Sequence, residues 1–296
     1  MQVDAPLRGW QLWLAGARPR TLGVAVAPVL VGTAAAHGVG SSISWLRALL
    51  VLVVALALQV GVNYANDYSD GVRGTDTDRR GPVRLTATGL ASPARVRTAA
   101  IVSLGVAAAA GFVLAALVSW WLLLVGVAAI AAAALYTGGP RPYGYSGFGE
   151  VMVLVFFGFV ATAGSAFVQA EEVPATAWWG SLVVGAVACA ILLVNNIRDV
   201  ATDERSGKRT LAVRIGDRNA RMLFGGCLAL AYVAVVAAAV DAPWALLALA
   251  TAPVAFVLAR RVRRAIAPPE LVAVLVATAR LDLATAILLA VGLWVA

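Results

Sequence analysis

The chain has 296 residues, of which 61% are hydrophobic and only 13% are charged. Its mean hydropathy of +0.88 lies far above that of a soluble domain, which excludes a soluble protein. The formal net charge is +8, but the arginines lie between apolar runs instead of forming one basic patch, which excludes a nucleic-acid-binding module. The two cysteines, Cys189 and Cys227, lie in apolar runs, so we expect neither a disulfide framework nor a cysteine metal site.

Nine apolar runs are long enough to cross the hydrocarbon core of a bilayer, which takes about 20 helical residues. They lie at 22–37, 45–66, 96–117, 119–136, 149–169, 177–196, 221–240, 243–259 and 272–296. The N-terminal segment lacks the pattern of a secretory signal peptide, so we expect the first run to remain in the protein. The sequence predicts an all-α bundle of about nine transmembrane helices, forming a single integral membrane domain over residues 1–296.

The connections between these runs are of two kinds. Those at 67–95, 137–148, 197–220 and 260–271 hold most of the arginines, whereas those at 38–44, 118, 170–176 and 241–242 hold no Lys or Arg. The positive-inside rule places the basic set, and with it the N-terminus, on the cytoplasmic side of the cell membrane. The two longest connections, 67–95 and 197–220, are also polar, so we expect function on that side.

The last apolar run contains two charged residues, Arg280 and Asp282. A charge at the middle of a bilayer is costly. Two interpretations stay open at this point. Either the helix spans from about residue 272 with both charges facing the protein interior, or its first part lies at the interface and the crossing begins beyond Leu283.

The second apolar run ends in an acidic, amide-rich cluster. Asn63, Asn66, Asp67 and Asp70 are three and four residues apart, so we expect them to share one helical face. Carboxylates near a helix C-terminus repel one another and oppose the helix dipole unless a cation is present. Mg²⁺ suits such a face, because it takes one or two protein carboxylates and completes its shell with water and phosphate oxygens. For any one Asp, a solvated helix end is the alternative. Of the following arginines, Arg79 and Arg80 are interpreted as cytoplasmic positive charge.

The sixth apolar run ends in a second cluster with a stricter spacing. Asn195, Asp199, Asp203 and Gly207 are each four residues apart. Gly207 is predicted to end the helix, so that Lys208 and Arg209 reach phosphate oxygens, with Arg198 beside Asp199. Lys208 is the only lysine of the chain, which suggests a compact point charge; one more inside charge is the alternative.

A third polar segment, 136–150, is rich in glycine and proline, which disfavour a regular helix. We expect Arg141 to contact phosphate and the tyrosines, Tyr136 among them, to form aromatic walls. A tight re-entry between two spans is the alternative and is compatible with this role. Arg18 and Arg20, before the first span, are interpreted first as an orientation signal and second as a contact for an acceptor carboxylate.

With these motifs the chain resembles the UbiA superfamily of intramembrane aromatic prenyltransferases, which implies a nine-helix bundle with two Asp-rich motifs at cytoplasmic helix ends. Asn66 and Asp70 match the first family motif, and the four residues of the second cluster match the second. One position departs from the pattern. Gly74 stands where the family has another Asp, so either Asp76 or Asp67 completes the first motif.

Segments 66–76, 81–84, 136–140, 195–199 and 207–214 are similar to the 1,4-dihydroxy-2-naphthoate prenyltransferases of menaquinone synthesis. The similarity implies transfer of a polyprenyl group from its diphosphate to 1,4-dihydroxy-2-naphthoate, with decarboxylation, giving demethylmenaquinone. Another aromatic acceptor, such as 4-hydroxybenzoate or homogentisate, is the nearest alternative. A cation transporter is a remote one, because transport carboxylates should lie near the bilayer midplane.

Under this hypothesis each polar residue has an expected role, with Mg²⁺ as the cofactor. The catalytic residues are Asn66, Asp70, Tyr136, Asn195 and Asp199. The diphosphate-binding residues are Arg141, Arg198, Lys208 and Arg209. The metal ligands are Asp67, Asp70, Asp76, Asp199 and Asp203. Prenyl chain length, the general base and the oligomeric state do not follow from the sequence.

Overall fold

Within residues 9–74, 83–264 and 267–296, which the computed structural model describes, all regular structure is helical. The long helices are α2 (Gly23–Gly38), α3 (Trp45–Arg73), α4 (Pro93–Leu117), α5 (Leu122–Leu135), α8 (Ala175–Arg205), α10 (Asp217–Ala238) and α12 (Pro268–Trp294). Two further spans are composite: α6 (Gly149–Val153) continues through the π-helical η3 (Leu154–Val160) into α7 (Ala161–Ala170), and η4 (Pro243–Thr251) continues into α11 (Ala252–Arg263). The short elements are α1 (Trp10–Ala17), η1 (Pro19–Thr21), η2 (Tyr143–Ser146) and α9 (Leu211–Ile215).

Each apolar run predicted from the sequence corresponds to a helix or a composite helix. In the described residues, seven helices are long and apolar enough to cross a membrane, and α1–η1 with α2 forms an eighth candidate bent by 52°. The remaining run, α5, has only 14 residues and is shorter than a typical span. The chain is therefore a multi-pass membrane protein, while the count of nine crossings and their orientation stay predictions.

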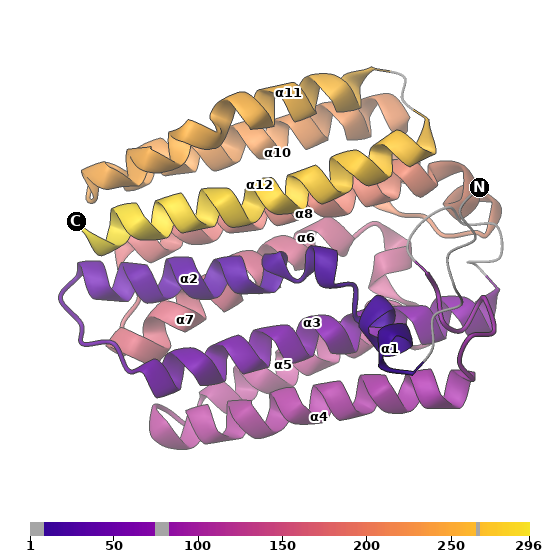
Figure 1. Cartoon of the computed structure of the whole chain (residues 1–296), viewed down its shortest axis with the longest axis horizontal. Helices are drawn as coiled ribbons and strands as arrows, with labels where there is room; N and C mark the ends of the chain where they lie inside the picture. The colour runs from indigo at the N-terminus through magenta and orange to yellow at the C-terminus, as the bar shows by residue number, and fades with distance from the viewer. Residues whose placement is uncertain (1–8, 75–82, 265–266) are drawn as a thin grey trace.

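The axes of the long helices are roughly parallel or antiparallel, and the helices lie beside one another (Figure 1). α10, α11 and α12 lie on one side, and α3, α4 and α5 lie on the other. α8 is the most buried of the spanning helices and packs against α10, α12 and η3. Small residues allow these close approaches: a Cβ at Gly158 of η3 would lie 2.9 Å from the Cα of Gly185 in α8.

The last helix decides between the two interpretations of its charged residues. α12 is one continuous helix from Pro268 to Trp294, so no separate interfacial part precedes Leu283. Asp282 faces the protein interior and is only 1% exposed, as the spanning interpretation predicted. Arg280 is exposed, so the expectation that both charges face inward is wrong for this residue.

The polar ends of α3 and α8 and the segment that joins α5 to α6 lie at the same end of the bundle (Figure 1). α8 ends at Arg205, and Gly207 follows with a left-handed φ of +75°. The backbone N–H of Lys208 then donates to the carbonyl of Asp203 over 2.8 Å, which closes the helix end. The predicted helix end is confirmed, and it brings Lys208 back toward α3.

Candidate functional site

Asp70, near the end of α3, is the centre of a buried charged cluster. The Tyr145 hydroxyl donates to its Oδ1 over 2.5 Å. Nη2 of Arg84 lies 3.6 Å from its Oδ2, and Nζ of Lys208 lies 3.9 Å from the same oxygen. The Asp70 side chain is 2% exposed, and a carboxylate so far from water needs compensating charge and hydrogen bonds. The two cations and the hydroxyl supply them.

Lys208 joins the two acidic clusters. Its Nζ lies 3.9 Å from Oδ2 of Asp70 and 3.9 Å from Oδ1 of Asp203. It also lies 5.0 Å from the centre of the Tyr145 ring, a cation–π distance. The polar ends of α3 and α8 thus face each other, and this single ammonium group lies between their carboxylates.

The four side chains of the first cluster are all buried on one face of α3, as predicted, but they form two neighbouring stripes that contact different partners. Asn66 and Asp70 face the segment that joins α5 to α6, where the Thr137 hydroxyl donates to Oδ1 of Asn66 over 2.8 Å. Asn63 instead faces α1, and its Nδ2 donates to the carbonyl of Ala17 over 2.9 Å. Side chains at these spacings span only about 100° around the helix axis, but different neighbours lie on the two sides of that face.

Asp67 belongs to the stripe of Asn63. Its Oδ2 accepts the backbone N–H of Leu85 over 2.8 Å, and its Oδ1 accepts that of Thr86 over 2.9 Å. Its carboxylate is therefore already engaged with the backbone, and its role as a metal ligand stays a prediction. Asp76, the other candidate for completing the first motif, lies outside the described residues.

In the second cluster, Arg198 is paired within its own helix. Its guanidinium donates through Nε to Oδ1 of Asp199 over 2.8 Å and through Nη2 to Oδ2 over 2.6 Å, a bidentate arrangement. Nη2 also donates to Oδ1 of Asn195 over 2.9 Å. Arg198 thus neutralises Asp199, one of the predicted metal ligands, while its contact with the diphosphate stays a prediction.

The segment joining α5 to α6 is held against α3 by Arg73, which donates to the carbonyls of Thr137 over 2.8 Å and Gly139 over 2.6 Å. The tyrosines predicted as aromatic walls lie here. The Tyr136 and Tyr143 rings pack 5.4 Å apart, and the Tyr143 hydroxyl donates to the Ala132 carbonyl. Burial raises the pKa of Tyr143 to about 12, so this phenol stays neutral at physiological pH.

Sequence reasoning did not single out Arg73 or Tyr145. Arg73 lies three residues after Asp70, a spacing that puts it on the neighbouring turn. Nothing in the local sequence distinguishes Tyr145 from the neighbouring tyrosines. Two predicted diphosphate contacts, Arg141 and Arg209, are solvent-exposed, and no ion pair joins either to the acidic clusters among the described residues. The backbone N–H of Arg209 donates to the carbonyl of Tyr145.

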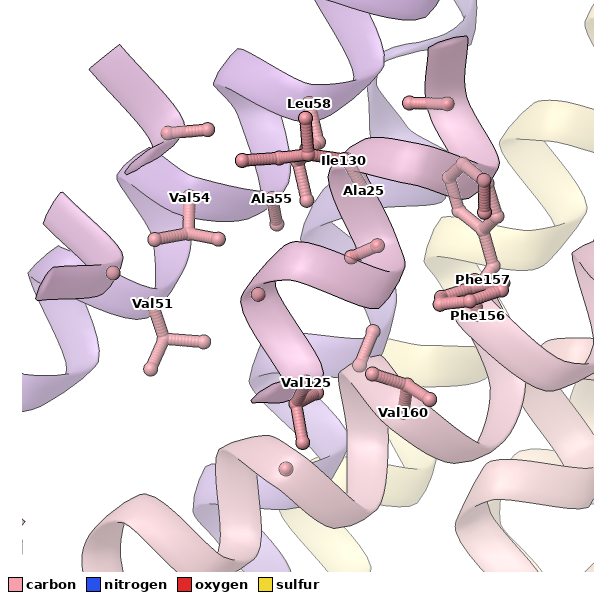
Figure 2. A pocket seen from close by; sticks show the side chains of 18 of the residues that line it. Ala25, Val51, Val54, Ala55, Leu58, Val125, Ile130, Phe156, Phe157 and Val160 are labelled. Carbon is pink, nitrogen blue, oxygen red and sulfur yellow. The ribbon is translucent and has the colours of Figure 1, made fainter. Parts of the chain in front are cut away.

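An apolar cavity of about 310 Å³ reaches the segment that joins α5 to α6. It lies between α2, α3, α4, α5 and the composite helix α6–η3–α7, and its walls are mostly Ala, Val, Leu and Phe side chains (Figure 2). Tyr136 and Tyr143 belong to its lining. The same segment carries Tyr145, which contacts Asp70, so it contributes both to the cavity lining and to the charged cluster.

The carboxylates suit a divalent cation that a substrate completes. Within the described residues, no group of three or more His, Cys, Asp and Glu side chains converges on one point. Mg²⁺ needs no such cage, because it commonly binds one or two carboxylates together with phosphate oxygens and water. Asp70 and Asp203, on either side of Lys208, offer the oxygen donors that this coordination requires.

Comparison with known proteins gives one consistent result. The family model of the UbiA prenyltransferases matches residues 25–270. The chain is 51% identical to a 1,4-dihydroxy-2-naphthoate octaprenyltransferase of Mycobacterium tuberculosis, over 89% of this chain and 90% of the relative. It is 36% identical to the Escherichia coli protein of the same name, over 96% and 95% of the two chains.

Solved structures share the fold. A UbiA homologue from Aeropyrum pernix aligns with a TM-score of 0.68 at 17% identity, covering 93% of this chain and 97% of the other. A UbiA homologue from Archaeoglobus fulgidus, described as bound to DMAPP and Mg²⁺, aligns with a TM-score of 0.60 at 17% identity, covering 94% and 99%. At these identities the likeness concerns the fold alone.

Proposed function

The chain belongs to the UbiA prenyltransferase family, as its motifs predicted, and from this premise we propose that it transfers a polyprenyl group to 1,4-dihydroxy-2-naphthoate. The direct product is the hydroquinone form, demethylmenaquinol, and its oxidation after the reaction gives demethylmenaquinone. The observation that carries the proposal is the buried cluster of Asp70, Lys208 and Asp203 beside an apolar cavity, which suits a donor with a charged head and an apolar tail. The name shared by the relatives at 51% and 36% identity supports the choice of acceptor.

In this proposal the diphosphate binds where Lys208 now lies between the two carboxylates. Lys208 and Arg84 donate to its oxygens, since both are within 4 Å of Asp70 and carry fixed positive charge. Mg²⁺, when bound by the carboxylates of Asp70 and Asp203 and the diphosphate, would supply further positive charge for the leaving group. Asp199, paired with Arg198, and Asp76 are the remaining proposed ligands.

The chemical step is an electrophilic substitution. The allylic C–O bond breaks and its electron pair leaves with the diphosphate, which the surrounding cations stabilise. The ring carbon of the acceptor that bears the carboxylate forms the new C–C bond, and CO₂ leaves with restoration of the aromatic ring. We propose that Asn66, Asn195 and the Tyr136 ring face the developing carbocation, because amide dipoles and a π-face stabilise positive charge without being alkylated as readily as a thiolate or amine.

The apolar cavity would hold the first isoprene units of the tail, and a longer tail would continue into lipid. The proposed setting is the cell membrane, with nine crossings, a cytoplasmic N-terminus and the charged cluster on the cytoplasmic side. The basic connections next to the cluster support this orientation.

The test uses the purified full chain in detergent with Mg²⁺, a polyprenyl diphosphate and 1,4-dihydroxy-2-naphthoate, and measures demethylmenaquinone and released CO₂. Wild-type protein should form both, whereas Asp70→Asn and Asp199→Asn should lose about 100-fold or more in rate, as when a transition-state stabiliser is removed. Asp217→Asn, which removes an exposed ion pair with Arg221, is the matched control and should keep full activity.

Parallel reactions separate the alternatives. Product with 4-hydroxybenzoate or homogentisate in place of the naphthoate would reassign the acceptor. Chelation of divalent cations should abolish turnover and Mg²⁺ should restore it. Asp-dependent cation flux in proteoliposomes without prenyl transfer would overturn the proposal in favour of a transporter.

A further inference from the structure

We propose that Asp67 is a positioning residue: its carboxylate holds the segment 83–91 so that the Arg84 guanidinium stays beside Asp70 and binds the diphosphate of the donor. This inference rests on the proposed function only for the identity of the anion. The contacts of Asp67 and Arg84 do not depend on that function. Asp67 lies three residues before Asp70 on α3, yet the two carboxylates contact different partners.

The first observation is the pair of hydrogen bonds that Asp67 accepts. An ionised carboxylate is acceptor-only, and each of its oxygens here receives one backbone N–H, from Leu85 and from Thr86. Directly after these residues the backbone forms turns: the N–H of Thr88 donates to the Arg84 carbonyl over 3.1 Å, and that of Ala91 to the Leu85 carbonyl over 3.0 Å. Asp67, on α3, therefore caps the start of these turns. It accepts their first backbone N–H groups, as the side chain of an N-cap residue does at the start of its own helix.

The second observation is the packing of the same segment. Leu85 is fully buried, and a Cβ at Gly16 of α1 would lie 2.8 Å from its Cδ1. One turn after Asp67 on α3, a Cβ at Gly71 would lie 2.5 Å from Cγ2 of Thr86. Gly71 thus continues the stripe of Asn63 and Asp67 along α3, and the segment 83–91 packs against it. Hydrogen bonding and packing therefore hold this segment at the same place on α3.

The consequence concerns Arg84, which directly precedes Leu85. Its side chain is 9% exposed and Nη2 lies 3.6 Å from Oδ2 of Asp70. Because the backbone on its C-terminal side is held by Asp67, the guanidinium is placed before the donor arrives, and less conformational entropy is lost when the diphosphate binds. The alternative role of Asp67, that of a metal ligand, requires its oxygens to share or give up the two backbone hydrogen bonds.

The experiment compares Asp67→Asn, Arg84→Gln and the double variant in the full chain, with Asp217→Asn as control. Asp67→Asn keeps the shape of the side chain but places an NH₂ donor opposite a backbone N–H donor. Each single variant should lower kcat/KM for the prenyl diphosphate by roughly tenfold, the size of one charge-assisted hydrogen bond. The double variant should lose no more than the larger single loss, because both act through one guanidinium. The Mg²⁺ concentration for half-maximal rate should not change.

A second measurement is independent of activity. Hydrogen exchange of the protein without Mg²⁺ or substrate should show faster exchange at the Leu85 and Thr86 amides in Asp67→Asn, and unchanged exchange there in Arg84→Gln. If wild-type protein transfers no prenyl group, the proposed function fails, while this exchange result still tests the positioning role.

Three results would overturn the inference. One is an increased Mg²⁺ requirement in Asp67→Asn with unchanged exchange, which would make Asp67 a metal ligand. Another is a double variant whose loss equals the product of the single losses, which would make the two residues independent. The third is unchanged kcat/KM in Arg84→Gln, which is decisive even if Asp67→Asn fails to fold.

Discussion

Lys208 is the residue on which both halves of the charged cluster depend. Its ammonium is the same distance, 3.9 Å, from carboxylates on α3 and on the end of α8. Without donor or metal, it is one of the charges that allow Asp70 and Asp203 to be buried so close together. With donor bound, it is free to pair with phosphate. A single flexible point charge suits this exchange of partners better than a planar guanidinium.

Replacing Lys208 by Met should therefore destabilise the protein most when divalent cations are absent. We expect the free energy of unfolding to fall by about 1–3 kcal/mol, because two buried carboxylates lose a shared partner. Mg²⁺ should restore more stability to this variant than it adds to the wild type. Thermal unfolding with and without Mg²⁺ measures both effects.

The control is Arg205→Met, which removes an exposed cation from the same helix end. Equal shifts in the two variants, with no difference in their response to Mg²⁺, would show that Lys208 contributes only general positive charge.

At the scale of elements, the site is assembled by segments that tie α3 to its neighbours. Arg73 holds the segment joining α5 to α6 through the carbonyls of Thr137 and Gly139. The same segment carries Tyr136 at the cavity and Tyr145 at Asp70. A shift of this segment would displace an aromatic wall and a hydrogen-bond donor together.

Arg73→Gln should accordingly reduce catalysis. Among the described residues, Arg73 forms no ion pair with Asp70 or with the second cluster, so its effect would come from the segment that it holds. A displacement of about 1 Å at a reacting centre costs up to 100-fold, so we expect kcat/KM to fall roughly tenfold or more. Steady-state kinetics measures the loss. Arg97→Gln, at an exposed position early in α4, is the control and should leave kcat/KM unchanged.

The composite helix that lines the cavity also approaches α8 closely, at Gly158 of η3. A Cβ at Gly158 would lie 2.8 Å from the Ser181 carbonyl oxygen and 2.9 Å from Cα of Gly185. Gly158→Ala should therefore force the two helices apart and cost about 1–3 kcal/mol of stability, the usual cost of overpacking. Gly164→Ala, on the same composite helix with nothing near its added methyl group, should change the thermal midpoint little. Equal midpoints for the two variants would contradict this prediction.

At the scale of the whole molecule, the proposed donor site has two parts: the polar end of the bundle would bind the diphosphate, and the apolar cavity would bind the prenyl tail. Charged groups from α3, the end of α8 and the segment 83–91 come together around Asp70 and Lys208. The cavity lies among the helices (Figure 2). Gly126 lines the cavity ten positions before Tyr136 in the chain, roughly 15 Å away along a helix. The two positions mark the distant and the near part of the tail site.

Gly126→Phe should therefore discriminate between donors by length. We expect kcat/KM to fall at least tenfold for a long polyprenyl diphosphate and to change little for a five-carbon one, since a large aromatic side chain occupies only the distant part of the cavity. Competition between the two donors measures the ratio. Gly105→Phe, on an exposed face of α4 with open space around it, is the control. The same loss for both donors would show that the cavity does not measure tail length.

The sequence by itself determined the positions of the helices, because hydropathy is a property of local composition and bilayer thickness sets the length of a span. It also determined the helix end before Gly207, through the conformational freedom of glycine, and the position of the acidic clusters on α3 and α8. The motifs in and between those clusters resemble one family, and the family model confirms it over residues 25–270.

Only the tertiary structure decided what each polar side chain faces. Asp67 and Asp70 share one face of α3, yet they contact different segments because different neighbours lie on the two sides of that face. The approach of Arg84, Tyr145 and Lys208 to Asp70 joins parts of the chain that no local pattern connects. Helix packing determines those partners, because a buried carboxylate must be hydrogen-bonded and can pair only with the donors that neighbouring segments place within reach.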